Sequence, residues 1–192
     1  MKRVLEVQFK KLDKRAKIPQ FAHPGEDVAV DVTVIDVEYD QASDVYIYHT
    51  GLACATDVRA SGFCFPRSSY YKHEYILSNH VGIVDTKGYR GEIKAFIRHR
   101  DSLHTRCMMT AMLRWDKMRW WEKLKVGSLK KLYDLCKEEF LEDPIKWAPY
   151  KPGERAFQIW FTELQPVTIK EVKKLDMNTS RGTGGFGSTG NK

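Results

Sequence analysis

An alternation of apolar and polar residues with a period of two is the pattern that most constrains this 192-residue chain. Val28, Val30, Val32 and Val34 alternate with smaller or polar residues, and the alternation changes phase at Ile35. Successive side chains of a strand point to opposite faces, so this pattern predicts a half-buried strand. The change of phase predicts a bulge or bend near Ile35.

Short strand-like runs follow along the chain, with turn signals such as Ser78-Asn79 and Lys87-Gly88 between them. They cover residues 45–48, 62–65, 75–77, 91–97 and the alternation at Phe157, Ile159 and Phe161. Many short strands joined by turns are typical of barrels, sandwiches and jelly rolls. We therefore expect an all-β body.

Residues 101–142 have a different period and predict a helical hairpin inserted into the β pattern. Ser128 is a suitable N-cap for the second helix, and a first helix is expected over about residues 105–125, broken at Gly127. Asp143-Pro144 would end the hairpin, because a residue before proline disfavours helix. Apolar residues of the second helix recur at helical spacing: Leu129, Leu132, Tyr133, Cys136 and Phe140.

The net charge of +7 is concentrated in the same part of the chain. Eleven basic and four acidic residues lie between Arg98 and Lys137, so the rest of the sequence is formally neutral. A basic stretch that contains Trp115, Trp120 and Trp121 could attract a nucleic acid or a protein partner. Amphipathic spacing favours the alternative, a surface hairpin whose Trp and Met side chains pack onto the β body or a neighbouring subunit.

The four cysteines form no C-x-x-C pair, and the six histidines have no metal-ligand spacing. We therefore expect reduced, mostly buried thiols and no zinc site. The sequence has no apolar run near the ~20 residues that a membrane helix needs. No apolar stretch follows the basic residues of the N-terminus, so we expect a cytoplasmic protein without membrane association.

Residues 178–192 are rich in glycine, and their composition alone predicts a flexible C-terminal arm. They contain a formal G-x-G-x-x-G, at Gly182, Gly184 and Gly187, but the chain ends too soon for the helix that a dinucleotide site requires. Backbone N–H groups of such a run can still bind phosphate oxygens, with a bidentate contact from Arg181. Phe186 could stack on a base.

Five segments, taken in order, resemble the five motifs of the homotrimeric dUTPase family. They are residues 27–32 (DVAVDV), 66–69 (PRSS), 79–92 (NHVGIVDTKGYRGE), 152–158 (PGERAFQ) and 181–190 (RGTGGFGSTG). The resemblance covers about residues 18–98 and 146–190. It implies a dUTPase-like distorted jelly roll, or β-clip, as one domain over residues 1–192, with the helical insertion at 101–142.

Some positions depart from the family pattern. Ala29 replaces a usual glycine, and Ser69 stands where many members have glycine. One extra residue separates Asp85 from Tyr89, so the hairpin must bulge or the tyrosine must shift. The helical segment has no counterpart in the compact members of the family.

The resemblance implies hydrolysis of dUTP to dUMP and pyrophosphate with Mg²⁺. Asp85 would orient and deprotonate the water that attacks the α-phosphorus, and Asp31 would support the water, the sugar or the hydration shell of the metal. Mg²⁺ usually keeps several waters and binds phosphates, so no direct protein ligands are expected. The family also implies a homotrimer whose sites are shared between subunits.

The remaining site residues follow from the same resemblance. The phosphates would be held by Arg67, Ser68, Ser69, Gln158 and Arg181, and by Gly187, Ser188 and Thr189. Phe186 would cover the uracil ring. The hairpin would read the base largely through backbone groups, at Asn79, Gly82, Ile83 and Val84. Tyr89, packed against the sugar, would disfavour a ribose 2′-hydroxyl.

Two other functions remain open. A dCTP deaminase has the same fold, but its deaminating glutamate would fall near Phe96, where this chain has no carboxylate. The second alternative is a binding protein on a dUTPase scaffold that acts through the basic, Trp-rich insertion.

Overall fold

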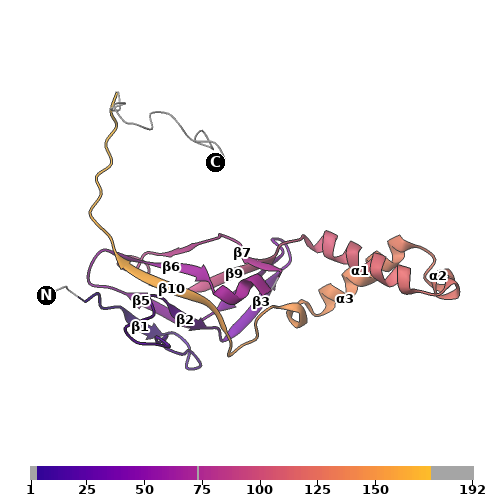
Figure 1. The fold of residues 1–192 in the computed structure, drawn as a ribbon, viewed down its shortest axis with the longest axis horizontal. Coiled ribbons are helices and arrows are strands. Elements are labelled where there is room, and N and C mark those ends of the chain that lie inside the picture. The colour runs from indigo at the N-terminus through magenta and orange to yellow at the C-terminus, as the bar shows by residue number, and fades with distance from the viewer. Residues whose placement is uncertain (1–3, 73, 174–192) are drawn as a thin grey trace, which may run out of the picture.

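The computed structural model describes residues 4–72 and 74–173. Its body consists of antiparallel strands in two four-stranded sheets and one two-stranded sheet (Figure 1). The first sheet has the order β2 (Val30–Thr33), β10 (Arg155–Glu163), β6 (Ala60–Pro66) and β8 (Gly82–Val84). The second has the order β3 (Asp36–Asp40), β4 (Val45–His49), β9 (Lys94–His99) and β7 (Tyr75–Leu77). The pair is β1 (Gln8–Lys11) with β5 (Leu52–Ala55).

The change of phase at Ile35 marks the place where the chain passes from one sheet to the other. Strand β2 ends at Thr33 in the first sheet, and β3 begins at Asp36 in the second. Val34 and Ile35, between them, are both buried. The predicted bend is therefore the corner at which the two sheets of the jelly-roll-like body meet.

The main core lies between the two four-stranded sheets and is built from the inward residues of their strands. The side chains that are fully buried include Val32, Val34, Tyr46, Tyr48, Ile97, Phe157 and Ile159. Two tyrosines keep their hydroxyl groups paired: Tyr48 donates to the carbonyl of Tyr150, and Tyr46 donates to the carbonyl of Pro144. These bonds join strand β4 to the segment that leads into β10.

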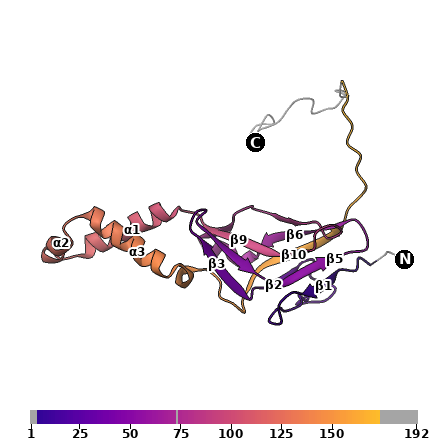
Figure 2. The same cartoon turned by 180° about the vertical axis from the view of Figure 1, so that it is seen from behind.

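The predicted helical hairpin is present and extends away from the β body as an arm (Figures 1 and 2). It contains α1 (Leu103–Lys117), α2 (Trp120–Val126) and α3 (Leu129–Glu142), followed by the short 3₁₀ helix η2 (Pro144–Trp147). Ser128 caps α3 as predicted, because its side chain accepts from the backbone N–H of Lys131. The first helix differs from the prediction, since the chain breaks at Met118 and Arg119 and forms α2 as a separate turn.

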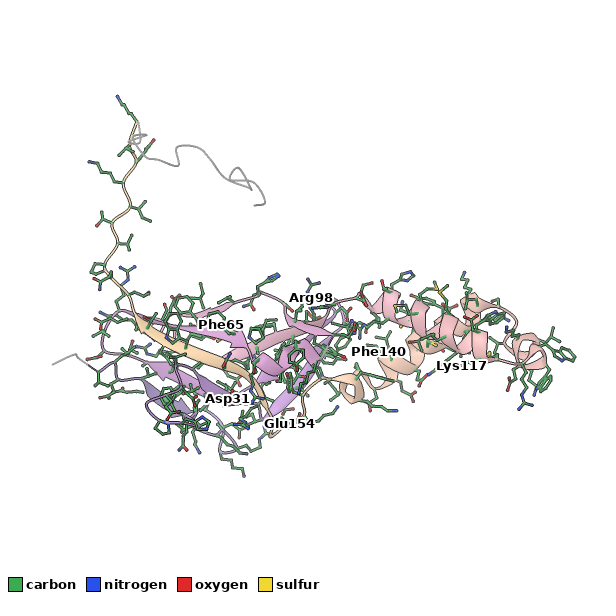
Figure 3. The ribbon with its side chains drawn as sticks, viewed as in Figure 1. Asp31, Phe65, Arg98, Lys117, Phe140 and Glu154 are labelled. Atoms are coloured by element: carbon green, nitrogen blue, oxygen red, sulfur yellow. The ribbon has the colours of Figure 1, made fainter. Side chains whose placement is uncertain are left out.

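The arm has an apolar core of its own, separate from that of the β body. Cys107 and Ala111 of α1 pack against Leu132 and Cys136 of α3. Figure 3 labels Phe140 at the base of the arm, where it belongs to the main core. The tryptophans of α2 do not pack onto the β body, and Trp120 is 70% exposed.

A short ion pair fixes the base of the arm. Arg106 of α1 contacts Asp44, which lies in the turn between β3 and β4, at 2.6 Å. The other carboxylate oxygen of Asp44 accepts the backbone N–H of Leu103 at 2.8 Å, which serves the first turn of α1. Tyr39 donates its hydroxyl to the same carboxylate.

After β10 the chain leaves the body as an extended segment, seen at the upper left of Figure 1. Its side chains are mostly exposed up to residue 173, where the described part of the chain ends. Among the described residues, none of the helices has the length and apolar character required to span a membrane.

Candidate active site

A carboxylate held by two arginines lies at one end of the first sheet. Asp31 of β2 contacts Nε of Arg67 at 2.8 Å with one oxygen, and Nη1 of Arg155 at 3.1 Å with the other. Arg67 also donates to the carbonyl of Arg155 at 3.1 Å. Strand β10 pairs with both β2 and β6, so it brings these three residues together from distant parts of the sequence. Asp31 is labelled in the body in Figure 3.

Gln158 lies beside this cluster. It is the register partner of Asp31 on β2 and of Phe65 on β6, and its side-chain amide donates to the carbonyl of Pro66 at 3.0 Å. Ser68 begins the 3₁₀ helix η1 (Ser68–Lys72) directly after Arg67. The predicted phosphate-binding groups Arg67, Ser68 and Gln158 are thus collected at one place.

These residues line an open cleft of about 410 Å³. Its other walls come from the loop before β2, which contributes Gln20, Ala22, His23, Asp27 and Ala29. Asp27 accepts the backbone N–H of His23, and this bond lowers the pKa of its carboxyl group. Ser69 is in the adjoining cleft, lined by Arg67, Tyr150 and Arg155 among others. A polyanion such as a triphosphate is a suitable ligand for this arginine-rich end of the sheet.

Asp85 lies at the other end of the first sheet, directly after β8. It is exposed and begins a tight turn, in which the backbone N–H groups of Gly88 and Tyr89 both donate to the carbonyl of Asp85, at 3.0 and 2.8 Å. The extra residue between Asp85 and Tyr89 is therefore accommodated as a widened turn. Buried Thr86 fixes this turn to the body, because its hydroxyl donates to the carbonyl of Ala60 at 2.7 Å.

Arg90 holds the same turn from outside. Its guanidinium group donates to the carbonyls of Thr86, Lys87 and Tyr89, at 2.8 to 2.9 Å. The ring of Tyr89 folds back over Gly91, where a Cβ atom would overlap it, and the Tyr89 hydroxyl donates to the carbonyl of Glu92. The tyrosine side chain thus has a defined position despite its exposure.

The predicted base-reading residues lie along β8 and the turn before it. Gly82 pairs with Cys64 and Val84 with Gly62 on β6, and a side chain at position 82 would press on Cys64. Ile83 is 65% exposed, and Asn79 is exposed in the turn before β8. Polar backbone groups and an apolar side chain therefore stand together at the outer edge of the sheet.

One chain does not bring Asp85 next to the arginine cluster. Asp85 follows Val84, which pairs with Gly62, whereas Arg67 follows the opposite end of β6. At the rise of a β-strand, about 3.3 Å per residue, the two positions are on the order of 15–20 Å apart along the sheet. The candidate residues thus form two halves, one around Asp31 and one around Asp85.

The other predicted site residues, Arg181, Phe186, Gly187, Ser188 and Thr189, lie outside the described residues, as does the predicted arm at 178–192. The structure adds groups that the sequence-based prediction did not assign a role. Arg155 lies in the segment 152–158, and its ion pair with Asp31 depends on strand pairing that the sequence does not reveal. Arg90 lies in the segment 79–92, and its bonds to the turn likewise depend on the folded structure.

Within residues 4–72 and 74–173, no three His, Cys, Asp or Glu side chains gather in a way that could hold a metal ion. The four cysteines are buried free thiols.

The curated proteins that are similar to this chain in sequence share one name. The chain is 29% identical over 188 residues to the deoxyuridine 5'-triphosphate nucleotidohydrolase of Rhodococcus erythropolis, covering 97% of this chain and 87% of the relative. It is 27% identical to the enzyme of the same name from Clostridium kluyveri, covering 97% and 99%. The chain is therefore similar to curated dUTPases over nearly its whole length. No protein-family model matches the chain.

Solved structures show the same fold at lower sequence identity. A staphylococcal bacteriophage 80alpha dUTPase variant with dUpNHpp superposes with a TM-score of 0.63 at 17% identity, over 97% of this chain and 99% of the phage protein. A dUTPase from phage phi11 of S. aureus, described with a species-specific insert, gives 0.55 at 14% identity, over 89% and 98%. The chain thus has the mainly β fold of these solved dUTPases over nearly its whole length.

Proposed function

We propose that this protein hydrolyses dUTP to dUMP and pyrophosphate. The observation that carries the proposal is the pairing of Asp31 with Arg67 and Arg155 beside Gln158, which makes a fixed cationic end of the sheet for a triphosphate. The names of the relatives and the order of the sequence motifs support the same substrate.

In the proposed reaction, Asp85 orients a water molecule and accepts its proton. The water oxygen forms a bond to the α-phosphorus, and the bond from that phosphorus to the bridging oxygen breaks, so pyrophosphate leaves. Positioning and neutralisation of charge provide most of the catalysis in phosphoryl transfer. Arg67, Ser68, Ser69 and Gln158 are proposed to bind the phosphates, with Arg155 as an additional cation.

The edge formed by residues 79–89 is proposed to select uracil and deoxyribose. Backbone groups near Asn79 and Gly82 can pair with the polar edge of the base, and a base with the wrong edge would leave them unpaired. The Tyr89 ring, fixed over Gly91, is placed to exclude a 2′-hydroxyl.

Mg²⁺ is the proposed metal, and the chain offers the oxygen donors that it prefers. Asp31 and Asp85 are the carboxylates that would lie near it, with most of its ligands coming from phosphate and water. When bound, the ion would neutralise phosphate charge. A phi11 phage dUTPase is described with a structural Mg(II) ion.

We further propose that the complete site forms between subunits of a homotrimer in the cytoplasm. Asp85 follows β8 and lies near the start of β6, whereas Arg67 follows the end of β6. A single nucleotide would therefore contact both residues only if two copies of the chain contribute. In this arrangement the uracil half of one protomer faces the phosphate half of its neighbour.

The activity is tested by measuring pyrophosphate release from dUTP, dTTP, dCTP and UTP. We expect turnover of dUTP to exceed that of the other three by orders of magnitude. Equal turnover of UTP or dTTP would contradict the assignment of residues 79–89, and ammonia release from dCTP would indicate a deaminase.

The shared site is tested by mixing two inactive variants, Asp85→Asn and Arg67→Ala. Co-refolding in equal amounts would assemble sites with both intact residues, about a quarter of the total if subunits mix at random. We expect activity to return to that extent. If each variant retained a fully separate site, the mixture would stay inactive although both proteins are folded and trimeric.

A further inference from the structure

The far end of the arm exposes apolar side chains that the rest of the chain leaves uncovered. In α2, Trp120 is 70% exposed, Trp121 42% and Leu124 69%. Positions 120, 121 and 124 share one face of a helix, because residues one and four apart lie within about 100° of each other. Large exposed apolar side chains gathered on one short helix are typical of binding surfaces.

Positive charge is concentrated around this face. Residues 115–131, here called the arm tip, contain six basic and two acidic residues. The basic residues are Lys117, Arg119, Lys123, Lys125, Lys130 and Lys131. One of the two acids, Glu122, is engaged by the backbone N–H of Arg119 at 2.7 Å. Figure 3 labels Lys117 on the arm, well away from Asp31 in the body.

The part of the arm that follows the tip in the sequence has the opposite charge. Residues 132–143, which form most of α3, contain five acidic residues and one basic residue. Charge is therefore separated along the arm, and the tip is positive in its own right. A polyanion would be attracted to the tip and repelled by the flank of α3 near the body.

Basic groups and aromatic rings already contact each other at the tip. The Arg119 guanidinium lies 5.1 Å from the ring centre of Trp121, and the Lys123 ammonium lies 5.5 Å from that of Trp115. Trp120 and Trp121 meet edge to face at 5.8 Å, which leaves a face of the more exposed Trp120 free for a flat partner.

We propose that the arm tip binds single-stranded nucleic acid, with bases stacking on the tryptophans and phosphates contacting the surrounding lysines. Stacking platforms flanked by cations are the usual means of binding unpaired strands without sequence preference. The apolar face is one short helix with three large side chains, which suits a base or two better than insertion into a lipid surface. This surface is distinct from the cleft at Asp31 and does not depend on the proposed hydrolysis.

The experiment measures fluorescence anisotropy of a short labelled oligothymidylate with the full chain at several salt concentrations. We expect Trp120→Ala to weaken binding about tenfold, within the range known for base–aromatic stacking. Changing Lys130 and Lys131 together to Gln should reduce the salt slope by about 0.7 for each phosphate that is no longer neutralised. The matched control changes Lys10 and Lys11 to Gln, because β1 lies at the end of the molecule opposite to the arm.

Several outcomes would overturn the proposal. Binding that Trp120→Ala leaves unchanged, and that heparin competes as well as the oligonucleotide, would indicate charge attraction without stacking. Binding that Arg67→Ala abolishes and the tip variants retain would locate the strand in the cleft. Failure to bind the oligonucleotide at low salt, with binding to anionic phospholipid vesicles instead, would assign the tip to membranes. Retained circular dichroism of each variant shows that it is folded.

Discussion

At the scale of single residues, Asp31 organises the phosphate half of the site. Its carboxylate engages Arg67 and Arg155 at once, so both guanidinium groups are fixed before a ligand arrives. Each guanidinium has five N–H donors, of which only some are used here. The remaining donors can therefore meet phosphate oxygens with little loss of side-chain entropy.

The role of Asp85 is tested by Asp85→Asn, which keeps the shape of the side chain and removes the base. We expect kcat for dUTP to fall by about 10²–10⁴-fold, the range for loss of a general base, with little change in KM. Steady-state pyrophosphate release measures both constants. Asp134→Asn, an exposed acid on the arm, is the control and should behave like the native protein. An unchanged kcat in Asp85→Asn would refute the mechanism.

Arg90 is expected to position Asp85 by holding three carbonyls of its turn. Arg90→Met should loosen the turn and lower kcat/KM for dUTP by about 10–100-fold, because small displacements of reacting groups cost that much. The melting temperature should change little, since the turn is at the surface. Lys87→Ala, in the same turn, is the control. An equal loss of activity in both variants would show that the bonds of Arg90 do not specifically position Asp85.

The convergence of these residues could be predicted only in part. The order of the motifs predicts that Asp31, Arg67 and Gln158 act together, and the structure brings them to one end of the sheet. The ion pair of Arg155 with Asp31 could not be predicted, because it depends on β10 pairing with both β2 and β6. The periodicity of the sequence also could not indicate that Asp85 lies beside the end of β6 that is opposite to Arg67.

At the scale of secondary structure, the apolar pattern identified most strands but not their sheets. Strand β7 and most of β4 and β6 were predicted from short strand-like runs between turn signals, and most of β10 from the alternation at residues 157–161. Strand β9 begins at Lys94, three residues later than predicted, since Ile93 instead bonds to the carbonyl of Leu52. No glycine or proline marks the break between α1 and α2 in the sequence. The bond from the backbone N–H of Arg119 to Glu122, which starts α2, is a local contact that was not predicted.

The junction between β9 and α1 is expected to be sensitive to acid. Burial lowers the pKa of His99, and the nearby Arg106 guanidinium lowers it further. Nδ1 of His99 accepts the backbone N–H of Asp101 at 2.9 Å, a bond that protonation at this nitrogen would remove. The unfolded chain takes up this proton near pH 6.5, so the free energy of unfolding is expected to decrease as the pH falls below about 6.5.

Urea unfolding on either side of that pH measures the effect. His99→Gln should flatten the pH dependence, whereas His80→Asn, at an exposed turn position with positive φ that Asn tolerates, should leave it as in the native protein. Parallel pH profiles for all three proteins would show that His99 makes no contribution.

At the scale of the whole molecule, the arm is joined to the body at its base and otherwise stands apart (Figure 2). Replacing residues 109–135 with a short Gly-Ser turn would remove the arm tip and keep Phe140, Leu103 and the Asp44–Arg106 pair. We expect kcat/KM for dUTP to stay within about threefold of the native value, because distant sites contribute independently. A shortened chain that folds and forms trimers yet lacks turnover would show that the arm takes part in catalysis.

The two apolar cores divide the four thiols into two pairs. Cys54 and Cys64 belong to the body, where burial raises their pKa values to about 11 and about 12, while Cys107 and Cys136 line the seam of the hairpin. A seam between two helices can separate by local opening while the sheets stay intact. A thiol reagent should therefore modify two cysteines quickly and two only on global unfolding. The rate at which Cys107 and Cys136 are modified would then report how often the two helices of the hairpin separate.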